Sequence, residues 1–138
     1  MALATQQQVE EFADSLSKSA DAVHERLINA IKNQEVDQLS AQSIFQDEAS
    51  LRQRANSLYL EAAKSVVEGI SDSQEDIIKL VYSAQEKIKT IKEIASFIDL
   101  TADLLVLASA AYAAKPAPII AALKEVKVDV SVIKKELA

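Results

Sequence analysis

The apolar residues along this chain recur at alternating spacings of three and four positions, which places them on one face of a helix. The first pattern predicts a helix from about residue 5 to 33. Ile28 and Ile31 widen the apolar face of this helix. Asn33 is expected to be its left-handed C-terminal residue, and the polar segment 33–37 is the expected turn.

Gly69, the only glycine, marks the expected end of a second helix that begins at about residue 37 and runs to 68. The apolar Ile70 follows it, as in a Schellman C-cap. A third helix is expected to begin next, because Ser73 and Asp76 have the spacing of a capping box.

The third helix is predicted to be the longest, because a repeat of about 3.5 residues continues from Ile77 to Tyr112 without interruption. Pro116 and Pro118 end this helix, since proline lacks the N–H that the helical ladder needs. The repeat forms a seam of apolar and small residues: Ile77, Val81, Ala84, Ile88, Ile91, Ala95, Ile98, Ala102, Leu105, Ser109 and Tyr112.

A fourth helix is expected from Ala117 or Pro118 onward, because apolar residues again recur with helical spacing. The segment 126–132 also alternates strictly between apolar and polar residues, so a strand is the competing interpretation there. Taken together, the sequence predicts one all-α domain over 1–138. Its expected form is an antiparallel four-helix bundle with a long third helix and a C-terminal apolar helical hairpin at about 95–123.

Composition narrows the possible functions. The 138 residues include no cysteine, so neither a disulfide framework nor a thiolate site is available. The formal charge of −6 argues against a nucleic-acid-binding protein, which needs a basic surface. The N-terminal residues lack the pattern of a secretory signal. We therefore expect a cytoplasmic protein, with export by another route left open.

Catalytic and metal sites have little support in the sequence. His24 is the only histidine, and its i, i+3 pairing with Asp21 lacks a third ligand. No glycine-rich phosphate loop, dinucleotide fingerprint or nucleophile motif is present. We therefore expect no enzyme activity, no catalytic or metal-binding residues and no cofactor.

A helical wheel of residues 94–113 shows a second apolar stripe opposite the seam. At about 25 cal/mol per Å2, leaving its leucines in water would forgo several kcal/mol of burial. The sequence therefore predicts that something covers them. The candidate interaction residues are this stripe, the turn of the hairpin and one residue beside it: Phe97, Leu100, Leu104, Leu107, Lys115, Pro116, Pro118 and Ile120.

Three covers for the second stripe are open: the chain itself, another protein chain, or lipid. The expected function is a non-enzymatic interaction or assembly module, whose hairpin binds a protein partner or a second copy of the chain. The third cover is supported by Leu104 to Leu123, which contain one charged residue, Lys115. This segment resembles the hydrophobic helical hairpin of the α-helical pore-forming toxins. That resemblance covers about residues 95–125 and implies, as the alternative, a membrane-active protein that inserts the hairpin into a bilayer.

Overall fold

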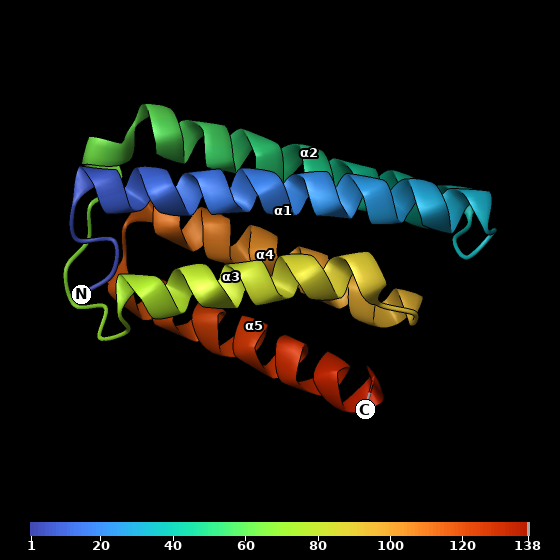
Figure 1. Cartoon of the computed structure of the whole chain (residues 1–138). Helices are drawn as coiled ribbons and strands as arrows, with labels where there is room; N and C mark the ends of the chain where they lie inside the picture. The colour runs from blue at the N-terminus through green and yellow to red at the C-terminus, as the bar shows by residue number, and fades with distance from the viewer. Residues whose placement is uncertain (138) are drawn as a thin grey trace.

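The computed structural model describes residues 1–137, with side chains described through residue 132, and this part of the chain is entirely helical apart from its connections (Figure 1). The strand interpretation of 126–132 is therefore wrong, since these residues belong to the last helix. The helices are α1 (Gln6–Lys32), α2 (Gln38–Leu60), a short 3-10 helix η1 (Ala62–Ser65), α3 (Gln74–Thr90), α4 (Ile94–Ala113) and α5 (Pro116–Leu137).

The helix start that the sequence predicts at Ser73 is confirmed. Ser73 precedes α3, and its hydroxyl accepts a hydrogen bond from the backbone N–H of Asp76 at 3.1 Å. Asp37 precedes α2 in the same way and accepts from Ser40. The turn between α1 and α2 is also confirmed, but the left-handed residue there is Gln34, with a φ of 57°, and not Asn33.

The predicted third helix is two helices. The chain leaves helical geometry at Ile91 and resumes it after Glu93, so α3 and α4 replace one continuous helix. α3 buries Ile88, whereas α4 buries Phe97 nine residues later. On an unbroken helix these two positions would point about 180° apart. The break therefore lets the apolar face of α3 that carries Ile88 and the stripe of α4 that carries Phe97 both face the interior.

The second helix also ends earlier than predicted, at Leu60 rather than at residue 68. Gly69 does have a positive φ of 95°, but it lies in the connection to α3 and caps no helix. This connection pairs with the N-terminal segment instead, since Val67 donates to the carbonyl of Leu3 at 2.9 Å. A contact across more than 60 residues thus replaces the last two turns of the expected helix.

The helices pack in a closed order in which α1 contacts α2 and α3, α2 contacts α4, and α5 contacts α4 and α3. Figure 1 shows α1 and α2 along one side of the molecule and α3 and α5 along the other, with α4 behind α3. The core lies between them and draws apolar side chains from every helix. The turn between α1 and α2 projects beyond the neighbouring α3–α4 connection (Figure 1).

Candidate functional site

Arg26 of α1 holds together the end of the molecule at which α1 turns into α2. Its guanidinium donates two hydrogen bonds to Glu35, of 3.0 Å and 2.9 Å, and Nε donates a third to the carbonyl oxygen of Ile91 at 3.0 Å. The same group lies 5.5 Å from the centre of the Phe97 ring. Only 6% of Arg26 is exposed. This one side chain therefore supports both the α1–α2 turn and the break between α3 and α4.

The Arg26 contact has an electrostatic consequence for Glu35. Hydrogen bonding to the guanidinium holds the pKa of the Glu35 carboxyl below its ordinary value, against a smaller opposing effect of burial. The carboxylate is thus ionised at neutral pH and keeps the two-bond geometry that arginine favours. The turn is fixed by a charge-assisted contact as well as by its backbone.

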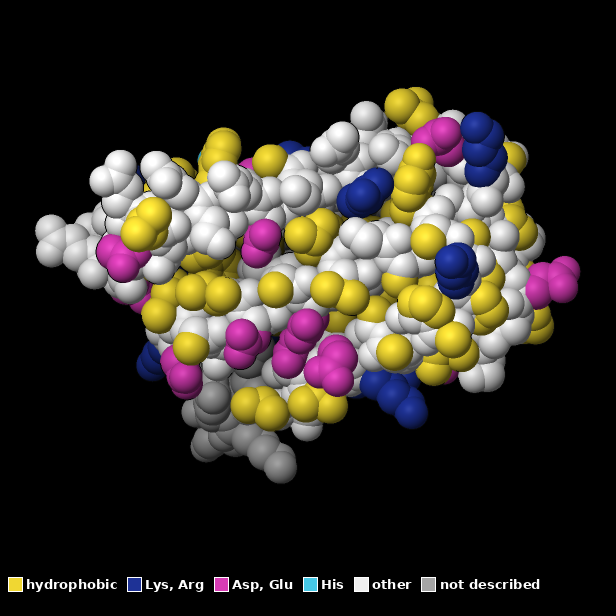
Figure 2. Space-filling view, turned by 180° about the vertical axis from the view of Figure 1, so that it is seen from behind, with side chains coloured by type: hydrophobic (Ala, Val, Ile, Leu, Met, Phe, Trp, Pro, Cys, Tyr) yellow, Lys and Arg dark blue, Asp and Glu magenta, His cyan; other side chains and the backbone are white. Residues whose placement is uncertain are grey.

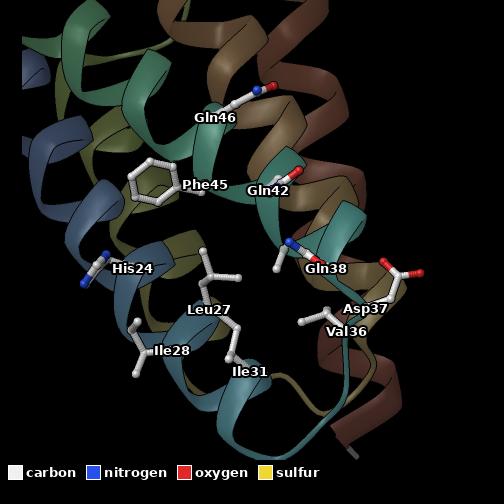
Figure 3. A pocket seen from close by; sticks show the side chains of 11 residues that line it. His24, Leu27, Ile28, Ile31, Val36, Asp37, Gln38, Gln42, Phe45 and Gln46 are labelled. Carbon is white, nitrogen blue, oxygen red and sulfur yellow. The ribbon is translucent and has the colours of Figure 1, made fainter.

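Beside this turn, α1 and α2 enclose a groove with a volume of about 750 Å3. Leu27 forms part of its buried floor, while Ile28, Ile31 and Phe45 line it with 37%, 47% and 55% of their surfaces exposed. Figure 3 shows Ile28 and Ile31 on α1, and Phe45 on α2. Large apolar side chains left in water around a concave surface are typical of a binding site.

The polar residues of the groove come mainly from the first turns of α2. Gln38, Gln42 and Gln46 follow one another at helical spacing and carry amides that both donate and accept hydrogen bonds (Figure 3). Asp37 adds a carboxylate at the end near the turn. Hydrogen bonds from Ser40 lower the pKa of Asp37, so this carboxylate is ionised at neutral pH.

His24 also lines the groove and belongs to a polar network between α1 and α2. Its Nδ1 lies 2.9 Å from a carboxylate oxygen of Glu48, whose side chain is 6% exposed. Arg52 donates to Glu48 at 3.1 Å and to Asp21 at 2.6 Å. Asp21 and His24, three residues apart on α1, thus contact different side chains of this network. Within residues 1–132, no group of three or more His, Asp or Glu side chains has the arrangement of a metal site.

The sequence-predicted interaction stripe lies inside the molecule. Phe97, Leu100, Leu104 and Leu107 have no exposed surface. Of the three possible covers for this stripe, the structure shows the first, the chain itself. These four residues therefore form no accessible surface in this fold. The seam, expected to be buried, is the less buried face of α4, since Ile98, Leu105 and Tyr112 are only partly buried.

The other predicted interaction residues lie at the α4–α5 turn. Lys115, Pro116 and Pro118 are exposed there, and Ile120 on the first turns of α5 is 37% exposed. The structure does not bring these residues together with the α4 stripe on one surface. α4 is also the one helix among the described residues that is long and apolar enough to cross a membrane by length and composition.

Several groove residues stand out in the sequence, but in other roles; His24, for example, stands out only as an isolated histidine. Ile28 and Ile31 were expected to widen the buried face of α1, and Phe45 lies off the apolar stripe of α2. The signal was therefore present as apolar residues outside both stripes. Recognising it required knowing that the two helices pack side by side.

The fold and the groove together define an all-α protein whose candidate site is an apolar surface groove between two helices. Comparison with protein-family models, curated proteins and solved structures finds no match for this chain.

Proposed function

We propose that this chain is an antiparallel helical bundle that acts without catalysis as a protein-interaction module, and that its α1–α2 groove receives an amphipathic helix of a partner protein. The observation that carries the proposal is the exposure of Ile28, Ile31 and Phe45 around one groove. Burying these side chains on binding removes apolar surface from water at about 25 cal/mol per Å2.

The shape and chemistry of the groove favour a helix as the occupant. His24 and Ile31 are seven residues apart on α1, so the α1 wall is about 10 Å long at 1.5 Å per residue. This length matches two turns of a bound helix, whose residues i, i+3 or i+4, and i+7 would contact the apolar floor. The glutamine amides of Gln38, Gln42 and Gln46 can hydrogen-bond the polar edge of that helix.

Charge indicates which partner fits best. Asp37 supplies a carboxylate at one end of the groove, so a helix with Lys or Arg at that end is complementary. A second copy of the chain is less suitable, because each copy carries a formal charge of −6.

Selection of displayed helical peptides on the purified protein tests this proposal. Peptides with the predicted apolar spacing should be enriched on the wild type, bind with micromolar affinity and lose at least tenfold in affinity on Phe45→Glu. Tyr82→Glu is the matched control, since Tyr82 is a similarly exposed aromatic residue on α3 outside the groove. Equal enrichment on Phe45→Glu and the wild type would refute the proposal. A dimer by sedimentation that Phe45→Glu abolishes would identify a second copy as the occupant.

Membrane insertion of the α4–α5 hairpin is the second candidate function, and the apolar length of α4 is the observation that favours it. Insertion would require α4 to leave the core, where its leucines are fully buried. Dye release from anionic liposomes, compared between wild type and Lys115→Glu, tests this candidate. No release by the wild type would exclude it.

A further inference from the structure

The contact between α4 and α5 brings carboxylates together. Asp99 and Asp103 of α4 face Asp129 of α5, and Glu125 lies one turn earlier on α5. Asp99 and Asp129 also line a pocket of about 180 Å3 with Ser96 and Val132. The back face of the molecule carries a group of acidic side chains in its lower half (Figure 2).

The surroundings of Asp129 disfavour its ionised form. Its Oδ2 atom is buried and has no hydrogen-bond partner among the described residues. The pKa of Asp129 is raised to about 8, chiefly by burial and further by the hydrogen bond to Asp103 and the charges of Asp103, Asp99 and Glu125. Two carboxyl groups can hydrogen-bond each other only if one of them holds a proton.

No described cation relieves this repulsion. Lys127, the lysine nearest to Asp129 in sequence, donates to Asp72 at 3.0 Å in the connection before α3. α3 also packs against α5, but none of its described charged groups acts on Asp129. The described carboxylates do not have the arrangement of a metal site. A proton on Asp129, in the direction of its raised pKa, would remove this repulsion.

The two halves of α5 are held differently. The first half buries Ile119, Leu123 and Val126 completely or nearly so. In residues 127–132, by contrast, Val128 and Val132 are about half exposed, and only Asp129 and Val130 are partly buried. This second segment is thus held by few contacts: the partly buried Asp129 and Val130, and the ion pair between Lys127 and Asp72.

We propose that residues 127–132 of α5 dock tightly on α4 only while Asp129 holds a proton in its contact with Asp103, so that this segment is a pH-sensitive latch. The raised pKa of Asp129 sets the direction of the pH dependence of docking, since the docked form binds a proton that the undocked form releases. Docking is therefore fully favoured below the ordinary Asp pKa of 3.8, weakens as pH rises and is lost above about 8. This inference is independent of the groove between α1 and α2.

The absence of cysteine from the sequence makes a direct test simple. Cysteines at the exposed positions Ala95 on α4 and Val128 on α5 can carry two spin labels, whose separation is measured with a chelator present. At pH 6 the wild-type background should give one narrow distance distribution. At pH 9.5 the distribution should broaden toward longer distances, while the helical content from α1 to α4 remains.

Asp129→Asn separates the latch from general alkaline loosening. The amide that this substitution introduces can donate to the side chain of Asp103 without a titrating proton, so the narrow distribution should persist at both pH values. Asp103→Asn makes the same prediction and serves if the first variant folds poorly. Glu25→Gln, an exposed change on α1, should keep the wild-type response. Identical wild-type distributions at pH 6 and 9.5, or an unchanged response in both Asn variants, would overturn the proposal.

Discussion

Arg26 and Glu35 form a two-bond ion pair across the α1–α2 turn, and the same guanidinium caps the carbonyl of Ile91 at the α3–α4 break. One buried cation thus joins two connections that are more than 50 residues apart in the chain. Because the carbonyl of Ile91 lies outside regular helix, it needs this partner.

Replacement of Arg26 by alanine should destabilise the fold by about 3 kcal/mol, since it leaves the Ile91 carbonyl and the Glu35 carboxylate without their partner. Urea unfolding followed by circular dichroism measures the change. Arg26→Lys should recover only part of the loss, because an ammonium cannot reproduce the planar fork. Lys32→Ala on the same helix is the control and should remain within about 0.5 kcal/mol of wild type.

The acid side of the stability curve should depend on Glu35. The pKa of Glu35 is lowered from 4.5, so its stabilisation is complete above about pH 4.5 and is lost as pH falls through the depressed value. Glu35→Gln should therefore flatten the fall in unfolding free energy below pH 4.5. The pKa of the exposed Glu75 is also lowered, through Lys79, but 0.5 M NaCl should screen that pair far more than the Glu35 contact. If Glu35→Gln leaves the fall in unfolding free energy below pH 4.5 unchanged at high salt, the Arg26–Glu35 pair does not stabilise the fold.

Charge placed on the buried stripe of α4 should unfold the protein. Leu104→Glu combined with Leu107→Glu introduces two carboxylates at positions with no exposed surface, at a cost comparable to the whole stability of about 5–15 kcal/mol. Far-UV circular dichroism should show loss of helix. Val106→Glu, on the same helix but 55% exposed, should fold normally. A soluble, fully helical double variant would mean that these leucines are not core.

Substitution of Gly69 by alanine should destabilise the protein by about 1 kcal/mol through backbone strain alone. Its φ of 95° is one that residues with a Cβ rarely adopt. An added Cβ would find ordinary van der Waals space 3.7 Å from Pro116, so steric overlap is not the cause. Thermal unfolding should show a melting temperature a few degrees lower, with no change in helical content. An unchanged melting temperature would show that this φ carries no strain.

The sequence was sufficient for features that depend on nearby residues. The cap at Ser73 and the bounds of α1 follow from local spacing, and both are confirmed. The existence of a helical stretch between Ser73 and Pro116 also followed from periodicity. All these features rest on contacts within a few positions along the chain.

The errors share a different physical cause, since each depends on a partner distant in sequence. Residues 61–68 include good helix formers, yet η1 and an extended segment form there because Val67 pairs with Leu3. The apolar repeat runs through Ile91 without a break in its pattern, so nothing local marks the end of α3. The cost of breaking the helix there is offset by Arg26, 65 residues away, which donates to the Ile91 carbonyl. The candidate groove was missed for the same reason, as neither helix alone contains it.

The Arg26 contact has a further consequence for the groove beside it. Because the turn that joins the two walls is anchored to the core through Ile91, its opening is coupled to the opening of the α3–α4 connection. The amides of the turn should consequently exchange slowly with solvent, unlike those of a free helical hairpin. The groove is thus preorganised, and a helix bound there would lose little affinity to ordering of the protein.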